Sequence, residues 1–237
     1  MAVVFRSVTS AVNTSFGTGP VVTAPAGLAD GDVIVIVFGT NDTLTAGGTP
    51  TLNGFTNLGI QNNGTVGGGH ALWKVASGEG ANWTFTGLWG GAGSIGDYAC
   101  VAYQDDAAGD AALDQSAVSA PTSSTTPVSP SITPSVDNCM VLGCFAGDAA
   151  ANTTATELGG ATERSDANNA SGTGKVYIEE LLQTSAAPVT MSATFTGAVE
   201  LAAYTLSIKP TAAAGRTTKN TRAFPLGVNV GMNWRSG

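Results

Sequence analysis

The stretch ADGDVIVIVFGTND, from Ala29 to Asp42, is echoed later in the chain by SVDNCMVLGCFAGD, from Ser135 to Asp148. Both begin with a short acidic turn, continue as an apolar strand that ends in Phe, and close with a small residue and an acid. Three more pairs of segments follow in the same order: GGGHALWKVAS with GTGKVYIEELL, NWTFTG with SATFTG, and DYACVAY with AAYTLSI. A repeated order at a nearly constant offset predicts that the chain is built from two similar halves.

The apolar residues in these segments have the spacing of β-strands. Between Val189 and Phe195 they alternate with serine and threonine, as expected when one face of a strand is buried. Val33 to Phe38 is apolar on both faces, so it is expected at the centre of a sheet, or under a loop or a neighbouring subunit, which would suit a trimer. Strand and turn formers dominate and charged residues make up only 11%, which predicts an all-β protein.

The segment between the halves, residues 119–135, carries four prolines and no charge. Because proline cannot donate to a central ladder, we expect an extended crossing or an edge there. Separate halves, about residues 20–104 and 131–208, would each expose one face of a small sheet. We therefore predict one jelly-roll-like β-sandwich over residues 1–208, with the Pro-rich segment crossing between two packed sheets. Two tandem small β domains are the alternative.

Residues 209–237 form a predicted C-terminal arm of different character. Residues 1–208 hold four basic and seventeen acidic residues, whereas the arm holds five basic residues and no acid. After Ala223 its apolar residues recur at every second position, a pattern that suits a strand added to another chain's sheet. Folding back onto the body and disorder are the alternatives. The residues expected to contact a partner are Arg216, Lys219, Arg222, Phe224, Leu226, Trp234 and Arg235. Nucleic acid is not expected, since the bases are sparse and the body is acidic.

The spacing G-x-G-x-x-G occurs at Gly91, Gly93 and Gly96. In a dinucleotide-binding site these glycines lead into a helix whose N-terminus holds the pyrophosphate. Here DYACVAY follows Gly96, and this β-branched and aromatic run is typical of a strand. The glycines are therefore interpreted as part of an inter-strand loop.

Few side chains in the sequence suit catalysis. His70 is the only histidine and, in VGGGHALWK, is interpreted as an exposed residue at a strand end, beside a candidate ligand loop. Glu179 and Glu180 are expected on opposite faces of a strand, where they cannot act as a pair. The three cysteines are interpreted as reduced core residues. We therefore expect no catalytic residue, metal or cofactor, and predict that the chain is not an enzyme. Calcium held by loop acids such as Asp30 and Asp32 is the alternative.

Three tryptophans bear on a carbohydrate-binding role, because flat aromatic rings pack on sugar faces. Trp73 and Trp83 fall at apolar positions of predicted strands and are assigned to the core. Trp89 lies between glycines and is the candidate for an exposed ligand platform.

The segments VVTAPAGLADGDVIVIVFGT, ALWKVASGEGANWTFTG and APTSSTTPVSPSITPSVDNCMVLGCFAG together resemble Gly/Ser/Thr-rich jelly-roll proteins found among the structural genes of tailed phages. The resemblance covers most of residues 20–208 and rests on strand-and-turn patterns. It implies a virion structural protein, most simply a capsid decoration (cement) protein whose partner is the major capsid protein or another virion subunit. A glycan-binding tail fibre or adhesin domain is the alternative.

The expected location follows from the same reading. The opening MAVVFRSVTSAVNTSFG lacks the charged and continuous apolar regions of a secretion signal. The longest apolar run, Val33 to Phe38, is far shorter than the roughly 20 residues that span a membrane. We expect a protein made in a host cytoplasm and carried on a virion, without a membrane partner.

Overall fold

The computed structural model describes residues 2–16, 19–41, 52–62, 67–86, 95–105, 111–168 and 174–210, and every regular element in these ranges is a β-strand. The strands of the first half are β1 (Val3–Ser15), β2 (Val21–Thr23), β3 (Val33–Thr40), β4 (Thr56–Asn62), β5 (Gly68–Val75), β6 (Asn82–Thr84) and β7 (Ile95–Asp105). Those of the second half are β8 (Ala111–Ser124), β9 (Cys139–Ala149), β10 (Ala155–Glu157), β11 (Thr162–Asn168), β12 (Lys175–Gln183), β13 (Ala193–Phe195) and β14 (Val199–Pro210).

The two halves form sheets of the same topology. The first sheet has the strand order β1-β7-β3-β5-β4, and the second, read from its corresponding edge, has the order β8-β14-β9-β12-β11. All neighbouring strands in both sheets are antiparallel. Strands at the same place in each half thus occupy the same place in each sheet, which confirms the predicted two similar halves.

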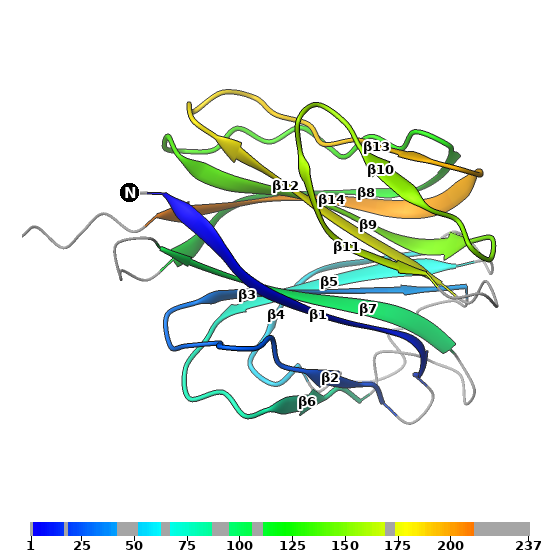
Figure 1. The fold of residues 1–237 in the computed structure, drawn as a ribbon, viewed down its shortest axis with the longest axis horizontal. Helices are drawn as coiled ribbons and strands as arrows, with labels where there is room; N and C mark the ends of the chain where they lie inside the picture. Colours follow the sequence, from blue (N-terminus) through cyan, green and yellow to red (C-terminus); the bar gives the residue numbers. More distant parts are fainter. Residues whose placement is uncertain are drawn as a thin grey trace, which may run out of the picture.

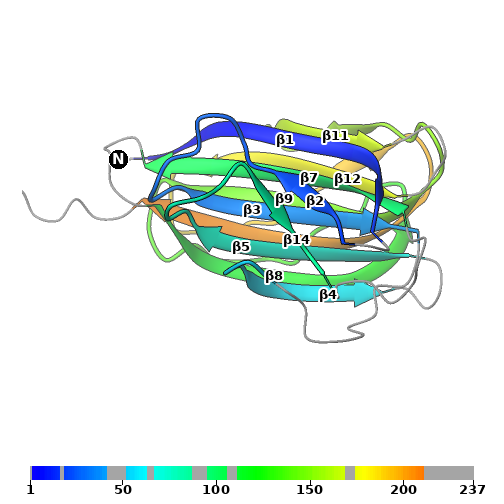
Figure 2. The ribbon, with the colours of Figure 1, turned by 90° about the horizontal axis from the view of Figure 1, so that it is seen from below.

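The two sheets pack face to face into a β-sandwich (Figure 1). Seen from below, their strands run in nearly the same direction (Figure 2), as in aligned sheet packing. Between them lies one core that takes side chains from both halves, such as Val35, Val101, Leu142 and Ile178. The all-β sandwich is therefore confirmed and the tandem-domain alternative is wrong. Each sheet draws its five strands from one half, an arrangement that does not confirm the finer jelly-roll connectivity.

Short strands cover the outer faces of the sandwich. The β2–β6 pair lies outside the first sheet and the β10–β13 pair outside the second (Figure 1). Under β2–β6, Ile34, Ile36 and Phe38 pack with Trp83 and Phe85. This second layer explains why every residue of β3 is buried. The apolar outer face of that strand is covered within the chain, so the strand gives no argument for self-association.

At one end of the sandwich the two sheets approach so closely that their backbones touch. A Cβ atom added to Gly69 of β5 would lie 2.5 Å from the Ala146 carbonyl oxygen of β9, and one added to Gly174 would lie 2.5 Å from the Gly39 carbonyl oxygen. A Cβ on Gly39 of β3 would in turn collide with the Lys175 carbonyl. Real Cβ atoms do not approach other atoms so closely, so these positions require glycine.

Farther along, a polar contact joins the sheets inside the core. The Tyr103 hydroxyl of β7 donates to Glu180 Oε2 of β12 at 2.7 Å. Glu180 also pairs with Arg164 of β11, whose guanidinium lies over the Phe5 ring of β1 at 4.1 Å from its centre. Because the buried carboxylate has a donor from each sheet, its desolvation is offset.

Two details correct the predicted boundaries. The chain passes from the first sheet to the second between Asp105 and Ala111, so the Pro-rich segment does not make the crossing. Residues 119–124 instead continue the edge strand β8, where proline needs no ladder partner. Strand β14 runs through Pro210, and Lys209 Nζ lies 3.3 Å from Asp114 Oδ1 of β8. Lys209, assigned above to the arm, therefore belongs to the sandwich.

In the part of the chain that the structure describes, no helix is long and apolar enough to cross a membrane.

Gly39→Ala should destabilise the protein by about 3 kcal/mol or more, because the added methyl group meets backbone that cannot rotate away. Urea unfolding monitored by tryptophan fluorescence would measure the change. Gly197→Ala is the matched control, since nothing lies within 4 Å of its Cβ position. We expect the control to stay within about 0.5 kcal/mol of the parent, and equal stability of the two variants would contradict the close approach.

Candidate functional site

Most residues predicted to bind a partner lie outside the described ranges. These are Arg216, Lys219, Arg222, Phe224, Leu226, Trp234 and Arg235 of the arm, and Trp89 of the candidate ligand loop. The structure therefore leaves their predicted roles untested. It does place the described residues that flank them. Strand β14 ends at Pro210, just before the arm, and strand β7 begins at Ile95, just after the segment that contains Trp89.

The assignment of His70 to an exposed strand end is wrong. His70 is fully buried within β5, on the outer face of the first sheet beside the Phe38 ring. Its Nε2 is 2.8 Å from Asn57 Oδ1 of β4. Burial lowers the pKa of His70 to about 4, so the ring is neutral at pH 7. The preceding glycines suggested a loop, but they belong to the region where the sheets touch. A buried, neutral His70 cannot serve a surface ligand.

Trp73 and Trp83 occupy the predicted core positions. Trp83 is 5% exposed and packs edge-on against Phe55, with ring centres 5.3 Å apart. Trp73 is partly buried against the central core. Both therefore match their predicted assignment to the core, while Trp89, the candidate ligand platform, lies outside the described residues.

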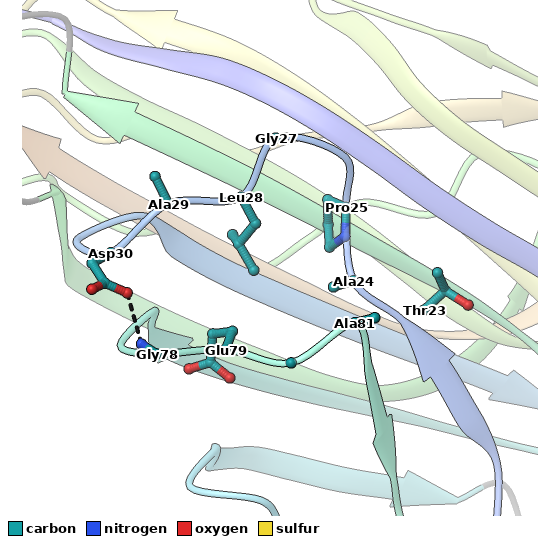
Figure 3. Close-up of a pocket in the computed structure, with 11 residues that line it drawn as sticks. Thr23, Ala24, Pro25, Gly27, Leu28, Ala29, Asp30, Gly78, Glu79 and Ala81 are labelled. Carbon is teal, nitrogen blue, oxygen red and sulfur yellow. Dashed lines mark hydrogen bonds between the residues drawn. The ribbon is translucent and has the colours of Figure 1, made fainter.

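A hollow in the described part of the surface lies over the first sheet (Figure 3). Its volume is about 460 Å³, and its walls are the β2–β3 loop and the β5–β6 loop. Small residues line most of it, and Leu28 and Pro25 supply the apolar floor (Figure 3). The polar groups at its margin are the carboxylates of Asp30 and Glu79.

Both carboxylates of the hollow already have partners. Asp30 Oδ1 accepts from the Gly78 N–H at 2.7 Å, which ties the two loops together (Figure 3). Glu79 accepts from Trp83 Nε1 at 2.9 Å and pairs with Lys74 at 2.6 Å. Although burial acts to raise it, these hydrogen bonds hold the pKa of Glu79 below its usual value. The hydrogen bond from Gly78 to Asp30 thus joins the two walls of the hollow, and both carboxylates at its margin have partners within the chain.

The remaining acids and thiols behave as structural groups. Asp32, a candidate calcium ligand, instead pairs with Arg6 of β1 and accepts from the Ala29 N–H. Within the described ranges, no three His, Cys, Asp or Glu side chains are grouped so that they could hold a metal ion. Glu179 and Glu180 lie on opposite faces of β12, as predicted. All three cysteines are free and buried, which confirms their core assignment.

Two long edge strands are features that sequence reasoning did not single out. β1 has 13 residues and β8 has 14, and each forms one outer edge of a five-stranded sheet. Each contains a single charged side chain, Arg6 or Asp114. Val8 and Val12 of β1 are 36% and 42% exposed. Long edges with few charges are where another chain can add a strand.

The outer face of the second sheet carries two buried charged positions on β12, Lys175 and Glu179. Both oxygens of Glu179 are buried, and the directly opposite residue on β11 is Glu163. Burial, with a further contribution from the charge of Glu157, raises the pKa of Glu179 to about 8. Glu179 is therefore mostly protonated at neutral pH and does not act as an ionised ligand.

No family model, no curated protein and no solved structure matches this chain.

Glu179→Gln should become more stabilising, relative to the parent, as the pH rises. The folded state holds a proton on Glu179 up to about pH 8, whereas the unfolded chain releases it near its ordinary pKa of about 4.3. The parent therefore loses stability between these values, by up to about 1.4 kcal/mol per pH unit, and the glutamine variant does not.

Urea unfolding of both proteins at a series of pH values from about 5 to about 9 would measure this difference. This range covers most of the interval between the pKa of Glu179 in the unfolded and in the folded state. Glu157→Gln removes only the neighbouring charge and should shift the profile by a smaller amount. A constant gap between parent and Glu179→Gln across the range would show that Glu179 titrates normally.

Proposed function

We propose that this chain is a phage virion structural protein, most simply a capsid decoration protein that binds the shell through its C-terminal arm. The observation that carries the proposal is the division of charge along the sequence. The chain has a formal charge of −8, and all seventeen of its acids but only four of its nine bases lie before residue 209. The basic, alternating arm would bind an acidic surface of a neighbouring subunit.

The character of the sandwich supports this division of roles. In the described residues, ionisable groups such as Glu180, Asp32 and Lys175 are occupied in joining strands and layers. What remains is a stable β-sandwich with long edges and few charges. Such a body suits a protein that lies on a surface and contacts neighbours through sheet edges and an added strand.

In this proposal the arm has two kinds of contact. Arg216, Lys219 and Arg222 pair with acidic residues of the shell, and the apolar residues Phe224, Leu226 and Trp234 fill pockets next to an added strand. The charge pairs would speed association and set its salt dependence, while the buried aromatic residues would hold the complex.

A chain that ends at Pro210 should keep its fold and lose binding to the shell. β14 is complete at Pro210 and pairs there with Ala111 of β8, so the truncation leaves every described strand intact. Co-sedimentation with capsids stripped of accessory proteins would measure binding, and the unfolding transition would confirm the fold. Saturable binding by the folded, truncated chain would overturn the role of the arm.

A glycan-binding tail fibre or adhesin domain is the second candidate, and one observation favours it. Thr40, Asn62 and Gly96 lie at the same end of the first sheet. Thr40 is paired with both Gly68 and Gly96 on the neighbouring strands, and Asn62 is paired with Gly68. The chain thus leaves β3 and β4 and enters β7 at this end of the sandwich, and the segment that holds Trp89 leads into β7 there. Loops gathered at one end of a rigid scaffold commonly form binding sites.

If this second candidate is correct, Trp89→Ala should weaken binding on a glycan array while the unfolding transition stays unchanged. Loss of a stacked aromatic ring costs about 1–3 kcal/mol of binding free energy, roughly 5- to 150-fold in affinity. Trp73→Phe is the control for general effects of tryptophan loss, because Trp73 packs against the core. The truncation at Pro210 would then leave binding intact, which separates the two candidates.

A further inference from the structure

We propose that Lys175 and Asp166 condense to form an intramolecular isopeptide bond that covalently joins strands β12 and β11. Lys175 Nζ is in direct contact with Asp166 Oδ1. The side chain of Lys175 has no solvent exposure, and that of Asp166 is 19% exposed. The inference concerns the stability of the sandwich and does not depend on the proposed function.

The register of the hairpin brings the two side chains together. Asn168 lies opposite Lys175 on β11, and Asp166 lies opposite Tyr177, so Lys175 and Asp166 are diagonal neighbours on the same outer face of the sheet. The β10–β13 pair covers this face (Figure 1). Phe195 of β13 lies over the ammonium group, with its ring centre 5.8 Å from Nζ. The amine and the carboxyl group are thus held in contact beneath an aromatic lid.

Burial makes the ionised form of this pair costly. Removing an ammonium and a carboxylate from water is unfavourable unless many hydrogen bonds compensate. Burial lowers the pKa of Lys175 to about 8, even though the charges of Glu163 and Asp97 act in the opposite direction. A proton that moves from Nζ to the carboxyl group converts the pair to a neutral amine and a neutral acid, the two forms that can react.

The reaction balances without any other reagent. The Nζ lone pair attacks Cγ of Asp166, and the Nζ–Cγ bond forms. Oδ1 keeps the proton already transferred, takes a second proton from the attacking nitrogen, and leaves as water when the Cγ–Oδ1 bond breaks. The third proton of the original ammonium group stays on the amide nitrogen. No oxidation occurs, and one water molecule is the only product released.

The surrounding hydrogen bonds fit both the reaction and its product. The Ala155 N–H donates to Asp166 Oδ2 at 3.1 Å, where negative charge develops as nitrogen attacks Cγ. Lys175 Nζ also donates to the Thr153 carbonyl at 2.9 Å. In the amide, Oδ2 keeps the donor from Ala155 and the remaining N–H keeps the acceptor at Thr153. The neutral product therefore loses a buried charge pair and leaves no polar group without a partner. Holding the reactants in contact also replaces a slow bimolecular encounter.

A second lysine–carboxylate pair in the chain lacks these features. Lys74 pairs with Glu79, but both side chains keep 10–12% exposure. Glu79 accepts three hydrogen bonds, which hold its pKa below the usual value. That carboxylate stays ionised and is a poor target for an amine. In the repeated segment of the first half, the sequence places His70 where the second half has Lys175. His70 lies beside Asn57 and has no amine.

Mass spectrometry of the full chain under denaturing conditions tests the proposal. We expect an intact mass lower than the sequence mass by one water molecule. Trypsin normally cuts after Lys175 and would release residues 165–175. An isopeptide bond blocks that cut, so residues 165–216 should appear as one peptide that lacks one water, since the Lys209–Pro210 bond also resists trypsin.

Two variants locate the loss of water. Lys175→Arg should restore the full sequence mass, whereas Lys74→Arg, the matched control, should keep the loss. The peptide map of the parent gives the same answer if Lys175→Arg does not fold. A parent that shows its full mass and releases residues 165–175, after prolonged incubation in the folded state at neutral pH, would overturn the proposal. Loss of water that persists in Lys175→Arg would also overturn it, since it would arise elsewhere in the chain.

Discussion

The contact between the two sheets at their glycine-rich end is the constraint on which the rest of the structure depends. Gly39, Gly69 and Gly174 allow backbone to meet backbone, because no side chain fits between the sheets there. From that end the sheets are filled by progressively larger side chains, and Tyr103 reaches across to Glu180. Without the glycines the sheets would separate, and the buried carboxylate would lose its donor from the opposite sheet.

The repeat of one topology gives two sheets, but the halves use equivalent positions differently. In the aligned segments GGGHALWKVAS and GTGKVYIEELL, His70 of β5 and Lys175 of β12 stand at the same position, and each is a buried polar residue on an outer face of its sheet. His70 is neutral and has Asn57 as its partner, whereas Lys175 faces a carboxylate. His70 makes one neutral hydrogen bond, through Nε2, whereas the pair at Lys175 retains charge that burial penalises. A covalent bond at Lys175 would remove that difference between the layers.

The sequence predicted the strands and their burial because both depend on local spacing. The period of two between Val189 and Phe195 and the apolar run of β3 are set by which faces are covered. His70 was misplaced because glycine usually marks a loop, whereas these glycines allow close packing between strands distant in sequence. Asp166 and Lys175 were missed for a similar reason. Their contact depends on the register of β11 and β12, and the one available signal was that Lys175 aligns with His70 in the repeat.

The placement of ionisable groups bears on where the chain can bind a partner. In the described residues, Arg6, Arg164 and Lys175 each pair with an acid of the same chain, and Lys74 and Lys209 do so as well. All five basic residues before Pro210 are therefore used inside the sandwich, while the other four basic residues follow it. A basic side chain that is already paired with an acid of the same chain contributes little further attraction to an acidic partner. In the proposed function, attraction to an acidic partner therefore comes from the segment after β14, where the bases have no acid near them in the sequence, and the sandwich serves as the folded body that carries this segment.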